Sequence, residues 1–119
     1  MAYKNSFLTG ITELLVLAIL NERGDSYVYE ITKYISEHSC NLLSLSLNTV
    51  YTVMYKLENE QMISEYATLV GKKRTRIYYH IEATGKKRLY ELTQNYDQIT
   101  NGVDYILTSF ADKKDTENG

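Results

Sequence analysis

The sequence predicts a mainly α-helical fold with a two-stranded β-hairpin and a long C-terminal helix, and three observations lead to this fold class. In the first half of the chain, apolar residues recur at steps of three and four, which is the period of helices with one buried face. A segment rich in β-branched and aromatic residues follows and is divided by Gly71, as is typical of a hairpin. The last third carries a heptad pattern, which indicates a long helix with an apolar seam.

The charge of the chain is unevenly distributed. The 119 residues carry a formal net charge of −2 and form one small domain's worth of sequence. Seven basic residues and one acidic residue lie between positions 72 and 88, so this segment carries +6 and the rest of the chain −8. A local basic patch, more than net charge, determines attraction to phosphates. The patch indicates a nucleic-acid surface, although a solvated charged face has the same composition.

Two helices are expected before residue 40. The first is predicted over residues 8–21, after a mobile arm over residues 1–7, and the second over residues 27–38 with Asp25 or Ser26 as its N-cap. The buried face of the first helix is predicted to contain Leu8, Ile11, Leu15, Ala18 and Ile19, widened by Leu14, Leu17 and Leu20. A helix this apolar is largely buried in a small domain.

The third predicted helix, residues 45–62, has an unusual outer face. Ser46 is its expected N-cap. Its apolar stripe is Leu47, Val50, Met54 and Leu57, and its opposite face carries Asn48, Thr52, Tyr55 and Asn59. Surface helices usually carry Glu and Lys there, whereas amides and hydroxyls can bond to base edges and phosphates in a major groove. The face is therefore suited to nucleic-acid contact, while an ordinary amphipathic helix with a polar surface is the alternative that this stretch alone leaves open.

A hairpin with a basic tip is predicted directly after this helix. Its strands are expected over residues 63–67 and 76–81, with Gly71 allowing the turn between them. A helix followed by such a hairpin is the outline of a winged helix-turn-helix, in which the helix enters a groove and the wing lies on phosphates. We therefore expect residues 1–82 to form a winged helix-turn-helix domain that binds double-stranded DNA.

The predicted DNA contacts fall into two classes. Side chains of the third helix are assigned to the groove and its edges, and basic side chains of the hairpin to phosphates. They are Ser46, Asn48, Thr49, Tyr51, Thr52, Tyr55 and Lys56 in the helix, and Lys72, Lys73, Arg74 and Arg76 in the hairpin. Tyr51 is ambiguous, because its phenol can reach a phosphate or brace the helix.

The last helix is predicted over residues 83–110 and carries the strictest pattern in the chain. Its seam alternates steps of three and four through Leu89, Leu92, Tyr96, Ile99, Val103, Ile106 and Phe110. A helix roughly 40 Å long cannot bury such a stripe on so small a domain, so a second copy of the chain is the simplest partner. Packing of the seam on the chain's own first helix is the alternative, and residues 111–119 are expected to form a frayed polar tail.

Other kinds of site find little support in the sequence. Cys40 is the only cysteine, which excludes an intrachain disulfide and fits a reducing cytoplasm. The apolar run at residues 11–20 is too short to span a bilayer. His38, Cys40 and His80 lack the spacing of a metal site, and a surface histidine and a small buried thiol are expected instead. No catalytic motif is present, so neither an enzyme nor a cofactor is predicted.

Taken together, these segments resemble the PadR family of bacterial transcriptional regulators, and its small multidrug-sensing, LmrR-like branch in particular. The similar segments are residues 13–20, 27–31, Leu45, 49–51, 57–58, 62–63, 76–79 and Gly85. Their order and spacing, more than any single segment, is specific. The resemblance implies a winged helix-turn-helix with a C-terminal dimerisation helix and a homodimeric repressor. In some members a planar hydrophobic compound releases the DNA.

Three positions depart from the family pattern. Thr52 stands where many members have proline, as in the small branch, and Glu82 stands where a threonine usually starts the last helix, so the cap is expected at Thr84. Tyr96 falls where the LmrR-like branch has the tryptophan that sandwiches drugs. Two smaller tyrosines could instead pack on each other and close the cleft.

The expected effector site lies between dimerised helices and comprises Leu8, Ile11, Leu15, Leu92, Tyr96 and Ile99. The alternative function is a dimeric ligand-binding or protein-interaction module that keeps the fold without binding DNA. Such a module needs neither a basic hairpin tip nor an amide and hydroxyl face, so these two features favour the DNA-binding regulator.

Overall fold

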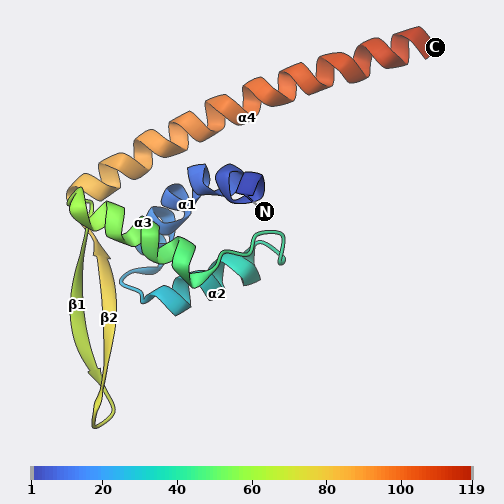
Figure 1. Cartoon of the computed structure of the whole chain (residues 1–119). Coiled ribbons are helices and arrows are strands. Elements are labelled where there is room, and N and C mark those ends of the chain that lie inside the picture. Colours follow the sequence, from blue (N-terminus) through green and yellow to red (C-terminus); the bar gives the residue numbers. More distant parts are fainter. Residues whose placement is uncertain (1, 119) are drawn as a thin grey trace. The chain divides into compact units, whose positions relative to one another are not determined.

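The computed structural model describes the backbone of residues 2–118 and the side chains of residues 10–111. The elements are α1 (Ala2–Arg23), α2 (Val28–His38), α3 (Leu47–Asn59), β1 (Ile63–Val70), β2 (Arg74–Ile81) and α4 (Ala83–Asn118) (Figure 1). This order confirms the predicted fold class, mainly α with a two-stranded wing and a long C-terminal helix. The chain divides into two units between Leu89 and Tyr90, so α4 begins in the first unit and continues in the second.

The core of the first unit is built around α1, which contacts α2, α3 and β2. Because neighbours cover it on several sides, its burial is centred differently from the predicted stripe. Val16, which was not predicted, and Leu17, from the widened edge of the predicted face, are fully buried, whereas Ile11 and Leu15 are only half-buried. The other buried apolar residues of the unit are Ile19, Leu20, Val28, Ile31, Ile35, Val50, Val53, Met54, Leu57, Ile63, Tyr79 and Ile81.

The start of α3 is determined by its N-cap. Ser46 Oγ accepts a hydrogen bond of 3.1 Å from the Thr49 N–H, which confirms the predicted cap. Three of the four predicted stripe residues are buried. Leu47, the first residue of the helix, is instead 46% exposed, and Val53 joins the buried face in its place.

Several predicted boundaries were wrong. α1 begins at Ala2 instead of residue 8, and α4 continues to Asn118 instead of ending at residue 110. The chain contains no proline, so nothing in either terminal segment forces a helix to stop. Neither Asp25 nor Ser26 caps α2, because the Ser26 hydroxyl donates to the Gly24 carbonyl at 2.9 Å and the Asp25 carboxylate binds the hairpin.

The hairpin is longer than predicted. Its antiparallel ladder runs from the pair Ile63 and Ile81 to the pair Val70 and Arg74, because the residues next to the turn also pair. Gly71 has a φ of 74°, a left-handed conformation that glycine adopts without steric cost. Figure 1 shows the hairpin extending away from α1, α2 and α3, so its turn lies far from the core.

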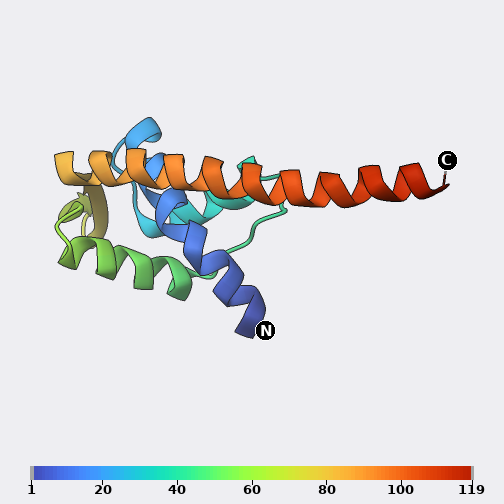
Figure 2. The same cartoon turned by 90° about the horizontal axis from the view of Figure 1, so that it is seen from above.

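The first turn of α4 is attached to the segment that follows α3. The Thr84 hydroxyl donates to the Gln61 carbonyl at 2.6 Å, so Thr84 is not the N-cap that was predicted. The Glu82 carbonyl instead accepts the first helical bond, from the Lys86 N–H, and the Glu82 carboxylate accepts from the Ser64 hydroxyl at 2.6 Å. From Ala83 onward α4 is one unbroken helix (Figure 2).

Candidate nucleic-acid interface

The outer face of α3 is exposed and carries no charge along its first two turns. Asn48 and Thr52 are exposed, and the residues Tyr51 and Tyr55 are 52% and 68% exposed. The Thr52 hydroxyl donates to the Asn48 carbonyl at 2.9 Å, which leaves its oxygen able to accept a further bond. Thr49 is half-buried, and its Oγ1 lies 2.9 Å from Ser46 Oγ.

The turn of the hairpin presents an open group of positive charges. Lys72, Lys73 and Arg74 are exposed, and within the described side chains none of them has a carboxylate partner. Exposed cations without internal partners are available to phosphates, and their binding releases counterions from DNA. We call these three residues the wing tip.

Two of the cationic side chains predicted to contact DNA, Arg76 and Lys56, already have partners within the chain. The guanidinium of Arg76 lies 4.1 Å from the ring centre of Tyr27, and a hydrogen bond with Tyr78 raises the pKa of Arg76. Lys56 Nζ donates to Glu13 Oε2 at 2.9 Å. A phosphate would have to compete with Glu13 for Lys56, so Lys56 differs from the wing tip.

The base of the hairpin is attached to the loop between α1 and α2. Asp25 accepts hydrogen bonds from the Tyr66 hydroxyl at 2.7 Å and from His80 Nδ1 at 2.8 Å, one on each carboxylate oxygen. Ser26 and Tyr79 exchange backbone hydrogen bonds of 3.2 Å and 2.9 Å as an isolated antiparallel bridge. Tyr66 follows Asp25 by 41 positions in the sequence, and His80 follows it by 55. No local sequence pattern reveals contacts over such separations.

Aromatic stacking stiffens the same region. Tyr66 and Tyr78 are opposite each other in the ladder, with ring centres 5.9 Å apart and nearly parallel. Tyr27 meets the edge of Tyr78 at 5.5 Å. Such pairs stabilise a sheet beyond their buried area, so the wing is braced from its base toward its tip.

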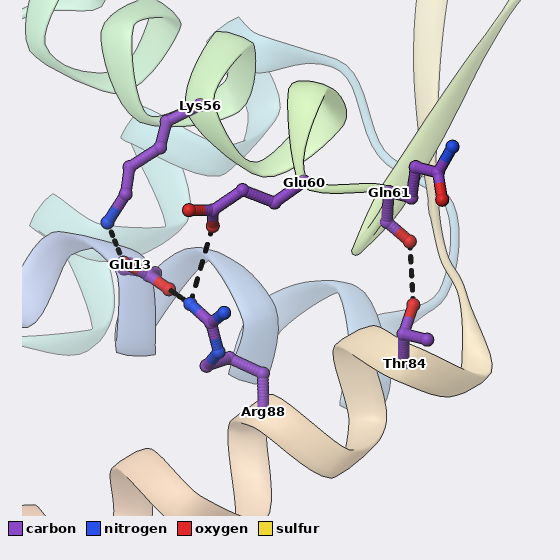
Figure 3. A network of polar contacts seen from close by, with 6 residues as sticks. All are labelled: Glu13, Lys56, Glu60, Gln61, Thr84 and Arg88. Carbon is purple, nitrogen blue, oxygen red and sulfur yellow. Dashed lines mark hydrogen bonds and ion pairs between the residues drawn. The ribbon is translucent and has the colours of Figure 1, made fainter.

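A second polar cluster joins three helices near the end of α3 (Figure 3). We call it the ionic cluster, and it consists of Glu13, Lys56, Glu60 and Arg88. Arg88 Nη1 lies 2.6 Å from Glu13 Oε1 and 3.4 Å from Glu60 Oε1. Burial alone would raise the pKa of Glu13, but hydrogen bonds and attraction from Lys56 and Arg88 outweigh it and hold that pKa below its ordinary value.

The predicted seam is apolar and open in the second unit. Leu89, in the first unit, and Leu92 are half-buried, whereas the side chains further along are exposed. Their exposed fractions are 45% for Tyr96, 65% for Ile99, 48% for Val103, 59% for Ile106 and 64% for Phe110. Large apolar side chains repeated along one helix face are typical of an interaction surface.

The predicted effector residues are divided between the two units. Ile11 and Leu15 belong to the first unit, and Leu92, Tyr96 and Ile99 to the second. Leu8 lies outside the residues whose side chains are described.

The expectation of a buried thiol at Cys40 was wrong. Cys40 is exposed, because it follows α2 in a left-handed turn with a φ of 55°. His38 is exposed as predicted and stacks on Tyr34 at 3.8 Å. Among the described residues, no group of three or more His, Cys, Asp or Glu side chains could hold a metal ion. In the same residues, no helix combines the length and apolar character needed to cross a bilayer.

Comparison with known proteins identifies the family. Residues 16–91 match the PadR-like family of transcriptional regulators. The chain belongs to this family. It is therefore a transcriptional regulator and not an enzyme, and the predicted resemblance is confirmed for the PadR family as a whole.

Solved structures of the family have the same fold. A transcriptional regulator from Clostridium thermocellum is 26% identical with a TM-score of 0.78, over 83% of this chain and 95% of the other. A PadR family regulator from Clostridium difficile is 26% identical with a TM-score of 0.70, over 82% and 98%. Bacillus subtilis PadR, crystallised with operator DNA, is 26% identical with a TM-score of 0.61, over 66% of this chain and 44% of that one.

The anchoring of the hairpin by Asp25 predicts a pH-dependent loss of stability in Asp25→Asn. Partial burial would raise the pKa of Asp25, but the bonds from Tyr66 and His80 lower it overall. The folded-state pKa therefore lies below the unfolded value of about 3.9, so the contribution is fully present above that pH and is lost as the pH falls through the folded-state pKa. Because the side chain is partly exposed, we expect a loss below about 1 kcal/mol at pH 7.

Urea unfolding of both proteins from pH 7 to pH 3, at one protein concentration, measures this difference. Asp104→Asn is the matched control, since Asp104 is exposed on α4, and it should leave the free energy of unfolding unchanged. A deficit of the same size at pH 3 and pH 7 would contradict the assignment.

Proposed function

We propose that the protein is a homodimeric transcriptional repressor that binds operator DNA through α3 and the wing tip. The observation that carries this proposal is the uncharged polar face of α3 together with three unpaired cations on the hairpin of a PadR-like winged helix. The structure of Bacillus subtilis PadR with operator DNA supports it, as a relative with the same fold. A carrier or interaction module would need neither of these surfaces.

Each class of side chain has its own role in the proposed complex. The Asn48 amide can donate and accept at an adenine edge, and the exposed Thr52 hydroxyl lies one turn further along the helix. Ser46 and Thr49 lie at the N-terminus of α3, where backbone N–H groups favour a phosphate. The wing tip lies on the backbone of the adjoining DNA and supplies affinity that depends on salt.

Dimerisation through α4 follows from its exposed seam. The five large apolar residues from Tyr96 to Phe110 lie at heptad positions and are each about half exposed or more. Their burial against the same face of a second copy removes apolar surface from water at a twofold interface. A dimer also presents two copies of α3 to two half-sites of an operator.

We further place the protein in the small LmrR-like branch, with release by a flat apolar effector. The effector stacks between the two Tyr96 rings of the dimer, next to Leu92 and Ile99 of the same unit. Tyr96 is 45% exposed, which leaves ring surface available for stacking. Half-sites about 34 Å apart tolerate little change in the spacing of the recognition helices, so wedging the subunits apart lowers DNA affinity.

Removing charges from the wing tip and removing groove contacts should affect DNA binding differently. Lys72→Ala combined with Lys73→Ala should weaken binding to all DNA sequences alike. The slope of log affinity against log salt concentration, expected to be about −5 to −7 for the wild type, should become less steep in this variant. Asn48→Ala should instead cost about 1–3 kcal/mol on the preferred sequence and little on unrelated DNA.

Fluorescence anisotropy with labelled duplexes, at several salt concentrations, measures both effects. Lys33→Ala removes one charge from α2, outside the predicted contacts, and is the control. Wild-type affinity that does not change with salt would refute the role of the wing tip.

Charges introduced in the seam should separate the dimer. Ile99→Asp with Val103→Asp places carboxylates opposite carboxylates in an apolar interface, which is strongly unfavourable. Sedimentation velocity should show a monomer or an unfolded chain. Tyr105→Asp changes an apolar residue that is 78% exposed and lies off the seam, so this control should remain dimeric. An intact dimer of the double variant would show that the seam is not the interface.

The stacking site predicts a specific loss of ligand binding. A planar aromatic dye should bind wild-type protein at least about tenfold more tightly than Tyr96→Ala, because stacking on two rings is lost. Tyr105→Ala is the matched control and should bind like the wild type. Titration followed by dye fluorescence measures the three affinities, and equal affinity for wild type and Tyr96→Ala would exclude the stacking site.

A further inference from the structure

The ionic cluster joins the recognition helix to the helix that carries the seam. Both oxygens of Glu13 are occupied, and each by a different helix. Oε2 accepts from Lys56 of α3 at 2.9 Å, and Oε1 accepts from Arg88 of α4 at 2.6 Å (Figure 3). Arg88 also lies 3.4 Å from Glu60, the C-cap residue of α3. One carboxylate of α1 therefore connects α3 with α4.

Glu13 and Arg88 are the shielded half of the cluster, whereas the side chains of Lys56 and Glu60 are 56% and 37% exposed. The side chain of Glu13 is 12% exposed and that of Arg88 28% exposed. Shielded and charge-assisted hydrogen bonds are stronger and more directional than surface ion pairs. By contrast, the exposed pair of Lys33 and Glu37 on α2 has a separation of 3.8 Å, with side chains more than half exposed.

A second set of contacts holds α4 at its start, one turn before Arg88. Thr84 donates to the Gln61 carbonyl, and the Glu82 N–H donates to the Met62 carbonyl at 2.9 Å. Gly85 is buried against the same segment, where a Cβ atom would collide with the Met62 carbonyl oxygen. Contacts at Thr84 and Arg88 are one helical turn apart, about 6 Å along the axis.

Two attachment points one turn apart determine the direction of a helix, whereas one point leaves it free to swing. The contacts at Thr84 hold the start of α4, and Arg88 supplies the second point. We propose that Glu13 is a positioning residue for DNA recognition, which fixes the direction of the first turns of α4, residues 83–89, relative to α3 and thereby influences the spacing of the two recognition helices in the dimer. This inference rests on the proposed function, because it requires a DNA-binding dimer.

The proposal assigns Glu13 an effect on spacing preference, which a purely stabilising ion pair lacks. A dimer with a fixed spacing binds half-sites about 34 Å apart and discriminates against altered spacing. One inserted base pair moves a half-site by roughly 3.4 Å and also rotates it about the duplex axis. If the joint at Glu13 is loosened, each winged domain can adjust, so discrimination falls while each domain still binds its own half-site.

The main test uses Glu13→Gln, which keeps the size of the side chain but removes its charge. Glu37→Gln is the matched control, because it makes the same change in the exposed pair on α2. Arg88→Met removes the α4 side of the joint and leaves the bond between Glu13 and Lys56 intact. Lys56 itself is left unchanged, since it is among the predicted DNA contacts.

The DNA probes derive from a duplex that wild-type protein selects from a random-sequence pool. Three forms are compared for each protein: the selected duplex, one with a single base pair inserted between the half-sites, and one with a single half-site. We expect the insertion to weaken wild type and Glu37→Gln about tenfold or more, but Glu13→Gln by less than about threefold. Arg88→Met leaves the bond between Glu13 and Lys56 in place, so it should bind the single half-site like the wild type. It should also repeat the spacing preference of Glu13→Gln.

The combined variant Glu13→Gln with Arg88→Met should discriminate between half-site spacings as well as Arg88→Met alone does, because both changes break the same joint. Equal weakening of Glu13→Gln on all three duplexes, or an unchanged spacing preference, would overturn the proposal. If Glu13→Gln does not fold by circular dichroism, the spacing preference of Arg88→Met decides in the same way. If wild type selects no duplex, the proposed function itself fails and the inference fails with it.

Discussion

The winged domain depends on the burial of α1 between its neighbours. Val16 and Leu17 are fully buried, and α2, α3 and β2 all contact this one helix. Full burial of such side chains contributes about 1.5–3 kcal/mol each, which is large against the net stability of a small domain. The recognition helix and the hairpin therefore take their positions from the same apolar surface, and polar contacts only refine them.

That refinement comes from two carboxylates that serve different surfaces. Asp25 attaches the base of the hairpin to the loop after α1, and Glu13 attaches the end of α3 to the start of α4. Both contacts join segments far apart in sequence, and neither carboxylate is among the residues that we assign to DNA. Loss of either one would disturb the orientation of a surface more than its composition.

Much of the fold could be predicted from local patterns, because the period of apolar residues indicates helices and strands, and turn residues indicate where hairpins reverse. The Ser46 cap and the turn at Gly71 depend on neighbouring atoms and were predicted correctly. Contacts between distant residues follow no such rule. Asp25 was expected to cap α2, and Lys56 was expected to face DNA, because nothing near them in sequence reveals a tyrosine, a histidine or a glutamate that approaches only in the folded chain.

The left-handed turn after α2 has a practical consequence. It exposes Cys40, the only cysteine of the chain, seven residues before α3 begins. A maleimide fluorophore would therefore attach to the natural sequence at a single position, on the segment leading into the recognition helix. The protein thus provides its own labelling site, close enough to α3 for energy transfer to a dye on the end of a duplex.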